Sequence, residues 1–294
     1  MMDTVRIGTL LSFLALSVML TGCGGSGSAT TGTMSLSVAD TPVDKASSVV
    51  VTFTGVQLHG VSGNDATFNF ASPKQIDLMT TQNGNAASLL DGVTIPAGNY
   101  QWIRLMVDLS QSSITLTDGS MHPLTLSSGE LKLVSGFSVA EGSQTDFTID
   151  FDLRKAVTLA NGNYILRPAL RLLNNQLAGM IMGSASNTFM IGSNSIASTT
   201  CSPAVYVYSG SNVTPVDINT TLTSTMQPIE TATLSLNNGT SNYDYKVAFL
   251  NPGVYTLTVT CALYDYSDSS DAITFSPTKT VTVMANTATT VGFP

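Results

Sequence analysis

Short runs of alternating apolar and polar residues recur from Met34 onward and constrain the fold more than any other feature. The run TMSLSVAD places Met34, Leu36 and Val38 at every second position. Successive side chains of a β-strand point to opposite sides, so this spacing predicts strands that bury one side. Charged residues make up only 10% of the chain, and Ser, Thr, Asn and Gly fill the polar positions. Because helix-favouring residues are sparse, we predict an all-β protein.

The run TDFTIDFDLRK, residues 145–155, shows the alternation most clearly. One side of this expected strand is apolar and the other is mainly acidic: Phe147, Ile149, Phe151 and Leu153 against Asp146, Thr148, Asp150 and Asp152. Antiparallel sheets commonly bury one side and expose the other. We therefore expect a half-buried strand whose acidic side faces solvent.

A phrase made of a turn, a tyrosine and a long strand occurs three times. It reads PAGNYQWIRLMV at 96–107, ANGNYILRPALRL at 160–172 and NPGVYTLTVTCAL at 251–263. Glycine supplies the positive φ of such turns, and a tyrosine at the strand start can pack while its hydroxyl binds nearby backbone. The phrase is typical of sandwich strands, and its spacing is too irregular for a solenoid or a propeller.

The chain has 294 residues, which favours two domains over one. A break rich in small residues, NNQLAGMIMGSASN, covers 174–187. We expect one β-sandwich over 34–175 and a second over 180–294. The second has the size of an immunoglobulin-like or transthyretin-like sandwich.

The amino-terminus reads as a signal peptide. Residues 7–20, IGTLLSFLALSVML, have the length of its hydrophobic region and are short for a membrane span, while Arg6 gives a weak positive start. The run ends in LTGC at 20–23, which resembles the bacterial lipoprotein box. The resemblance implies a signal peptide over 1–22 and acylation, including palmitate, at Cys23. The alternative is an ordinary signal peptide with an incidental cysteine.

Residues 23–33 then form a lipidated cysteine and a flexible linker, since GGSGSATTGT has a linker composition. Two or three acyl chains hold a protein stably at a membrane, whereas one chain binds only marginally. Gly24, rather than Asp, follows the cysteine. Under the usual sorting rule of Gram-negative bacteria this implies the outer membrane.

Cys201 and Cys261 are the remaining cysteines once Cys23 is lipidated. Exported proteins meet an oxidising compartment, so a Cys201–Cys261 disulfide is expected. The alternative is two buried free thiols. Three Cys and two His are too few to favour zinc.

Several phrases lie in order along residues 33–175: LSVADTPVDKASSVVVTFTGVQLHG, IDLMT, LLDGVTIPAGNYQWIRLMVD, FTIDFDLRKAV and YILRPALRLL. Together they resemble the bacterial and archaeal lipoprotein family called domain of unknown function 4382. The resemblance implies a lipid-anchored, β-rich exported domain and brings no activity or catalytic residues. In the second half, LNPGVYTLTV resembles transthyretin-like or carboxypeptidase-regulatory sandwiches, which usually serve as structural or interaction units.

Two acidic clusters are weak calcium candidates, because calcium prefers oxygen ligands on loops. Asp40 and Asp44 flank a proline in VADTPVD, where we favour an Asx turn in which Asp40 caps backbone amides. Asp265, Asp268 and Asp271 lie in YDYSDSSDA, which lacks the glycine and terminal glutamate of an EF-hand. We favour a solvated loop there, with a carbohydrate-binding tip as the weaker alternative, and expect no cofactor.

Catalytic motifs are missing from the sequence. His59 and His122 are the only histidines, and the sequence contains no G-x-S-x-G nucleophile motif. We expect both histidines to have structural roles, and we expect that the protein is not an enzyme. Asp150 and Asp152 form a carboxylate pair that strand alternation explains without catalysis.

Trp102 and Arg104 project to the same side of their expected strand, opposite Ile103 and Leu105. An exposed pair of this kind would favour ligand recognition. We favour instead a second core side, or an Arg104 that pairs with the acidic strand.

The net charge is −8, and 11 basic residues spread along the chain do not make a phosphate-binding surface. Nucleic acid is therefore not an expected partner. We expect a lipid-anchored protein of the bacterial cell envelope with a non-catalytic binding, adhesive or scaffolding role, held to the membrane by its lipid and facing an envelope protein or glycan. The alternatives are a carbohydrate- or calcium-binding module of a polysaccharide-handling system and, less favoured, an envelope hydrolase.

Overall fold

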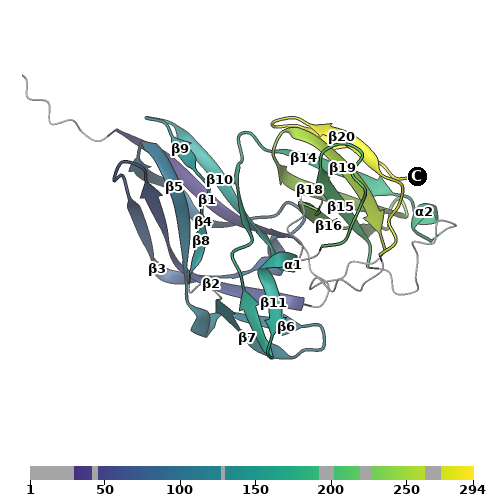
Figure 1. Ribbon diagram of the computed structural model, residues 1–294, viewed down its shortest axis with the longest axis horizontal. Helices are drawn as coiled ribbons and strands as arrows, with labels where there is room; N and C mark the ends of the chain where they lie inside the picture. Colours follow the sequence, from purple (N-terminus) through teal and green to yellow (C-terminus); the bar gives the residue numbers. More distant parts are fainter. Residues whose placement is uncertain (1–29, 42–45, 127–129, 192–201, 219–226, 262–272) are drawn as a thin grey trace, which may run out of the picture.

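The computed structural model describes residues 30–41, 46–126, 130–191, 202–218, 227–261 and 273–294. These residues form four β-sheets arranged as two sandwiches (Figure 1). The chain is therefore an all-β protein, as the alternation predicted. The signal peptide and the linker up to residue 29 lie outside the described residues, as do these candidate site residues: Cys23, Asp44, Cys201, Asp265, Asp268 and Asp271.

The first sandwich contains a four-stranded and a nine-stranded sheet. The smaller sheet has the order β13 (Leu170–Asn174), β10 (Gln144–Asp152), β1 (Thr31–Thr41) and β4 (Ala87–Pro96). The path of the larger sheet is β11 (Val157–Ala160), β12 (Asn163–Leu166), β7 (Met121–Leu126), β6 (Ser113–Leu116), β2 (Ala46–Gly60), β5 (Gly98–Val107) and β8 (Leu131–Leu133). In addition, β3 (Ala66–Asp77) pairs with β2, and β9 (Phe137–Val139) pairs with β5.

The core of the first sandwich follows the period-two pattern. Met34, Leu36 and Val38 of β1 are fully buried, as are the apolar residues of β10 that face the same way. Within the smaller sheet β1 runs parallel to β10, and both outer strands are antiparallel to their neighbours. Short turns connect the strands: η1 (Leu78–Thr81), η2 (Leu109–Gln111) and α1 (Leu153–Ala156).

The second sandwich contains two four-stranded sheets and has its own core. One sheet has the order β17 (Ser235–Asn237), β18 (Asn242–Leu250), β14 (Gly179–Ala185) and β21 (Ala288–Thr290). The other has the order β16 (Glu230–Thr233), β15 (Ala204–Ser209), β19 (Gly253–Thr260) and β20 (Lys279–Val283). A short helix, α2 (Asn187–Ile191), follows β14. Among the described strands, none pairs across the two sandwiches; the exact bounds 34–175 and 180–294 stay a prediction.

Two of the three tyrosine phrases fix their turns as expected. The hydroxyl of Tyr100 donates to the carbonyl of Pro96 at 2.7 Å, and that of Tyr255 donates to the carbonyl of Asn251 at 2.6 Å. Each tyrosine therefore closes the turn four residues before it while its ring is buried.

Within the described part of the chain, no helix has the length and apolar character needed to cross a membrane.

Candidate functional site: the joint between the sandwiches

The acidic side of β10 is buried, so the expectation that it faces solvent is wrong for most of its residues. Thr148, Asp150 and Asp152 are exposed by 0%, 3% and 9%. The reason is tertiary: β10 lies between β1 and β13 in its sheet, and residues of the second sandwich bond to this side of the sheet. The strand pattern identified the two sides correctly but did not reveal what covers the polar one.

Arg171 is the central residue of the joint. In register across the sheet, Asp150 of β10 lies between Ala39 of β1 and Arg171 of β13. Both Nε and Nη2 of Arg171 donate to Oδ2 of Asp150, at 3.0 and 2.6 Å. Arg171 also forms an ion pair with Glu230 of β16, in the second sandwich. One guanidinium therefore holds a carboxylate from each sandwich.

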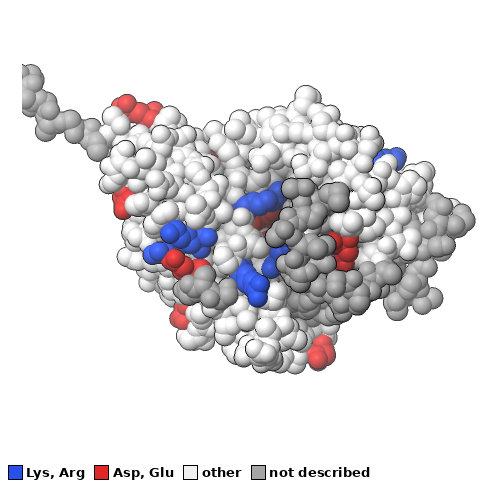
Figure 2. All heavy atoms as spheres, viewed as in Figure 1, with Lys and Arg blue, Asp and Glu red and all other residues white. Residues whose placement is uncertain are grey.

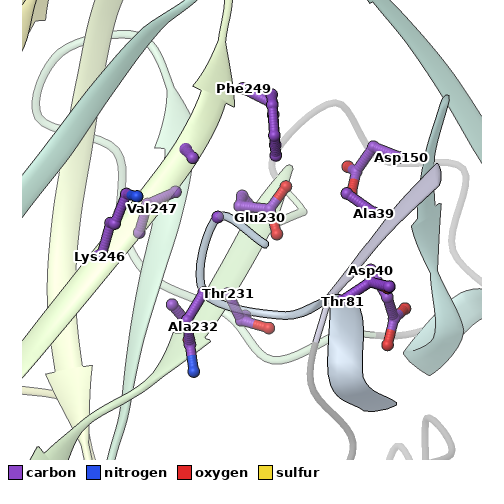
Figure 3. Close-up of a pocket in the computed structure, with 13 residues that line it drawn as sticks. Ala39, Asp40, Thr81, Asp150, Glu230, Thr231, Ala232, Lys246, Val247 and Phe249 are labelled. Atoms are coloured by element: carbon purple, nitrogen blue, oxygen red, sulfur yellow. The ribbon is translucent and has the colours of Figure 1, made fainter. Parts of the chain in front are cut away.

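Glu230 is held by two strands of the smaller sheet, β1 and β13, which lie on either side of β10. Its Oε1 accepts a hydrogen bond of 2.6 Å from Thr41, the last residue of β1, while its other oxygen pairs with Arg171. Figure 3 shows Glu230 facing Ala39 and Asp150, whereas Asp40 directs its carboxylate away from them. This difference follows from strand alternation, because Asp40 is one residue out of phase with Ala39 and Thr41.

Burial makes two carboxyl groups at the joint, those of Glu230 and Asp40, hard to ionise. Burial, together with the nearby charge of Asp150, raises the pKa of Glu230 well above 4.5, although Arg171 opposes the shift. For Arg171, burial would lower the pKa, but Asp150 and Glu230 outweigh it and raise the pKa. Burial also raises the pKa of Asp40 well above 3.8. Arg171 therefore stays charged, and Glu230 depends on it for compensation.

A second set of contacts comes from α1, which directly follows β10. Arg154 is 1% exposed, and its Nη2 lies 3.0 Å from Oδ1 of Asp217. Its Cζ lies 4.9 Å from the ring centroid of Tyr206, and the hydroxyl of Tyr206 donates to the same Asp217 oxygen at 3.1 Å. The next residue, Lys155, donates to the carbonyl of Pro228 at 2.9 Å. Thus Arg154 and Lys155, at the end of the acidic strand run, bring two cations into contact with the second sandwich.

The joint leaves a cavity of about 10 Å³, enough for roughly one water molecule. Asp150, Glu230, Thr231 and Lys246 are among its lining residues (Figure 3). Figure 2 shows basic and acidic side chains next to each other where the two sandwiches meet. Paired charges in so small a space suit a structural contact, since a reactive group needs room for a substrate.

The structure gives Asp40 two hydrogen bonds. Its Oδ1 accepts from the backbone N–H of Leu153 at 3.3 Å, and its Oδ2 accepts from Gln82 at 3.1 Å. Asp40 therefore caps a backbone amide that is distant in sequence, while residues 42–45 of the expected Asx turn lie outside the described residues. Among the described residues, no three His, Cys, Asp or Glu side chains are grouped as a metal site would require.

Cys261 is 5% exposed at the end of β19. The backbone N–H of Ser202 donates to its carbonyl at 3.0 Å. The chain next to Cys201 therefore lies beside Cys261, and the disulfide itself stays a prediction.

The two histidines have polar partners that do not make a catalytic triad. Nδ1 of His59 lies 2.9 Å from Asp65. Around His122 the order is Asp118, Ser120, His122: the Ser120 hydroxyl donates to Asp118 at 2.6 Å and lies 3.1 Å from Nε2 of His122. A nucleophilic triad needs the imidazole in the middle, between hydroxyl and carboxylate. Here the Ser120 hydroxyl takes the middle position, between Asp118 and His122.

Trp102 lies on the surface of the larger sheet. The two favoured expectations, a second core side and an Arg104 that pairs with the acidic strand, are therefore both wrong. His59 stacks on the indole with centroids 4.8 Å apart, and Nζ of Lys132 lies 4.4 Å from the ring centroid. Arg104 pairs with Glu130, at the start of the neighbouring strand, rather than with β10. Cross-strand neighbours thus cover the tryptophan, which strand alternation alone does not identify.

Comparison with known proteins identifies the first sandwich. Residues 31–168 match the family model described as Domain of unknown function (DUF4382). The chain therefore carries a DUF4382 domain over these residues, as the resemblance of its phrases indicated. The family search identifies no domain in the second sandwich, and no curated protein matches the chain.

Solved structures similar to the chain include a bacterial leucine-rich repeat protein and two pilins. A leucine-rich repeat protein from Bacteroides thetaiotaomicron is 13% identical with a TM-score of 0.23; the match covers 90% of this chain and 26% of that one. GBS52, the minor pilin of Streptococcus agalactiae, is 13% identical with a TM-score of 0.20, over 88% and 94%. BcpA, the major pilin subunit of Bacillus cereus, is 11% identical with a TM-score of 0.21, over 90% and 69%. These TM-scores are too low to define a common fold for the whole chain.

Proposed function

We propose that this protein is lipid-anchored in the bacterial cell envelope and serves as a non-catalytic binding, adhesive or scaffolding protein. In this proposal Cys23 carries the lipid, residues 24–30 act as a flexible linker, and the first sandwich supports the second. The linker ends three residues earlier than the expected bound of 33, because β1 begins at Thr31 and pairs with β4. The usual sorting rule favours the outer membrane. Within the second sandwich, a Cys201–Cys261 disulfide would stabilise the end of β19.

The path of β1 is the observation that carries the proposal. Its first residue, Thr31, follows the linker, and its last residue, Thr41, bonds to Glu230 at the joint. Eleven extended residues span about 35 Å. The linker thus attaches at the end of the first sandwich that is remote from the second (Figure 1). A lipid at Cys23 would hold the second sandwich away from the membrane.

The buried charges of the joint support a scaffolding role. Domains of one chain move relative to each other unless their interface is extensive. Here Arg171, Arg154 and Lys155 each bond to the second sandwich, and breaking a buried ion pair by removing one partner is strongly destabilising. Such contacts favour one fixed arrangement of the two sandwiches.

The anchor is tested by a Cys23→Ala variant expressed in the native host. We expect the wild-type chain to incorporate a fatty-acid probe and to fractionate with membranes, and the variant to do neither. A Ser26→Ala variant in the same linker is the matched control and should behave as wild type. Retention of the Cys23→Ala variant in the membrane fraction would count against a lipid anchor.

A further inference from the structure

Strand β13 forms an open edge of the smaller sheet in the first sandwich. Among the described strands it pairs only with β10. The N–H of Asp152 donates to Ala169, and the N–H of Asn175 donates to Asp146, so the hydrogen-bonded pairs are those of residues 169, 171, 173 and 175. In an antiparallel ladder the intervening residues point their backbone groups the other way.

The backbone groups of Leu170 and Leu172 therefore point outward. No described residue donates to or accepts from them. Their side chains are only partly buried and pack at the margin of the core, as do Leu133 of β8 and Phe137 of β9 on the opposite sheet. Unpaired edges are usually blunted; β3, another edge strand, carries Pro73 and Lys74. Leu170–Asn174 contains no proline and no lysine.

Two hollows flank this edge, one on each side of the sheet. A hollow of about 350 Å³ lies on the side of Arg171, with Asp152, Lys155 and Pro228 in its lining. The other, of about 260 Å³, lies on the core-facing side of the strand, and its lining includes Leu172 and Phe137. An extended peptide sends alternate side chains to opposite sides, so a strand beside β13 would direct them toward these two hollows in turn.

We propose that the open edge of β13 binds an extended peptide segment of an envelope partner, which adds to the sheet as a further strand. Backbone hydrogen bonds to Leu170 and Leu172 would provide affinity, and the two hollows would select alternate side chains. The core-facing hollow is lined mainly by polar groups, with Ser135, Ser138 and Asn174 among them, and favours a side chain that carries a hydroxyl or ammonium group. This inference rests on the proposed binding role and names the class of its partner.

The chemistry of the other hollow narrows the peptide further. Asp152 is 9% exposed, and its Oδ1 accepts no hydrogen bond from any described residue, whereas its Oδ2 lies 2.7 Å from Lys155. That Oδ1 atom has almost no accessible surface, so a peptide side chain in the hollow meets the surrounding apolar groups instead. The rest of this hollow is mainly apolar, with Leu170, Pro228 and Ile229 in its lining, so an apolar peptide side chain is expected on this side.

The test uses the mature chain in detergent and a labelled nonapeptide, Lys-Val-Thr-Val-Lys-Val-Thr-Val-Lys, as the probe. Its valines all face one side and its donors the other. We expect saturable binding by fluorescence anisotropy. We also expect hydrogen exchange of the Leu170 and Leu172 amides to be fast in the free protein and slow with the probe, while the Arg171 amide is slow in both. The same peptide with proline in place of its central lysine should not bind.

Two variants isolate the backbone contribution. Leu172→Pro removes an outward N–H and leaves the ladder to β10 intact, whereas Leu172→Ala removes a similar side chain but keeps the N–H. The proline variant should bind the probe about tenfold more weakly than the alanine variant, the factor of one net hydrogen bond.

Three results would overturn the proposal: no binding of the probe, equal binding by the two variants, or Leu170 and Leu172 amides that are already protected in the free protein. If those amides become protected simply on raising the protein concentration, the occupant is a second copy of the chain, and the peptide proposal is wrong. Because binding is measured in detergent, failure of the lipid-anchor test would leave this result unaffected.

Discussion

Replacing Arg171 by methionine should weaken the joint, so that the two sandwiches unfold in separate transitions. Methionine keeps the apolar stem and removes the guanidinium, which leaves the carboxylates of Asp150 and Glu230 side by side. Their side chains are 4% and 8% exposed, so water does not replace the lost partner. Removing one partner of a buried ion pair typically costs about 3–5 kcal/mol.

We expect the lower end of that range, about 3 kcal/mol, for two reasons. The Arg171 side chain is itself 31% exposed, so solvent already screens part of its interaction. In addition, the pKa of Glu230 is already raised by burial, and the carboxyl group can take up a proton when its cation is lost. Protonation limits the repulsion from Asp150.

The assay is urea unfolding at neutral pH, followed by intrinsic fluorescence and circular dichroism. Wild type should unfold in one cooperative transition, and Arg171→Met in two, because the joint couples the sandwiches. Arg167→Met is the matched control: Arg167 is exposed and forms no ion pair with a described residue, so its loss should change stability by less than about 0.5 kcal/mol.

Neutralising the partners should rescue the variant. Adding Asp150→Asn and Glu230→Gln to Arg171→Met removes the uncompensated charges, and we expect at least half of the lost stability to return. If Arg171→Met is no more destabilised than Arg167→Met, the joint is not held by buried charge, and the reasoning is refuted.

Three further predictions follow from individual contacts. First, the pKa of Glu230 in the folded state lies above the ordinary 4.5, so between these two values the folded state binds more protons than the unfolded chain. The free energy of unfolding should therefore fall as the pH rises through that window. Glu230→Gln should flatten this slope in urea titrations from pH 4.5 to 8. Second, Tyr255→Phe should destabilise by about 1 kcal/mol by thermal unfolding through loss of the bond to Asn251, and an unchanged melting temperature would speak against this bond. Third, if Cys201 and Cys261 are bridged, reduction should lower stability by about 4 kcal/mol, and mass spectrometry without reductant should find the linked peptides.

Much of the architecture can be read from local residue pattern. The alternation of Met34, Leu36 and Val38 predicts both the strand and its buried side, because a strand has only two sides and water rejects one of them. The tyrosine phrases similarly predict turns, since the hydrogen bonds of Tyr100 and Tyr255 reach only four residues back. Interactions of this range depend little on the rest of the chain.

The joint could not be predicted in the same way. Asp150 and Arg171 are 21 residues apart in the chain, and Thr41 and Glu230 are 189 apart. Alternation placed Asp150 on the polar side of its strand and made solvent the simplest neighbour. A strand pattern reports the polarity of a side, and a buried ion pair gives the same polar signal as an exposed carboxylate.

The sequence by itself determined the all-β class, the buried sides of the strands and the turns that connect them, because these depend on the chemistry of neighbouring residues. Only the tertiary structure decided that the acidic side of β10 meets the second sandwich, that Arg171 lies between two carboxylates and that β13 has an open edge. Those features depend on which distant segments share a sheet or an interface, and that choice is made by the packing of the whole chain.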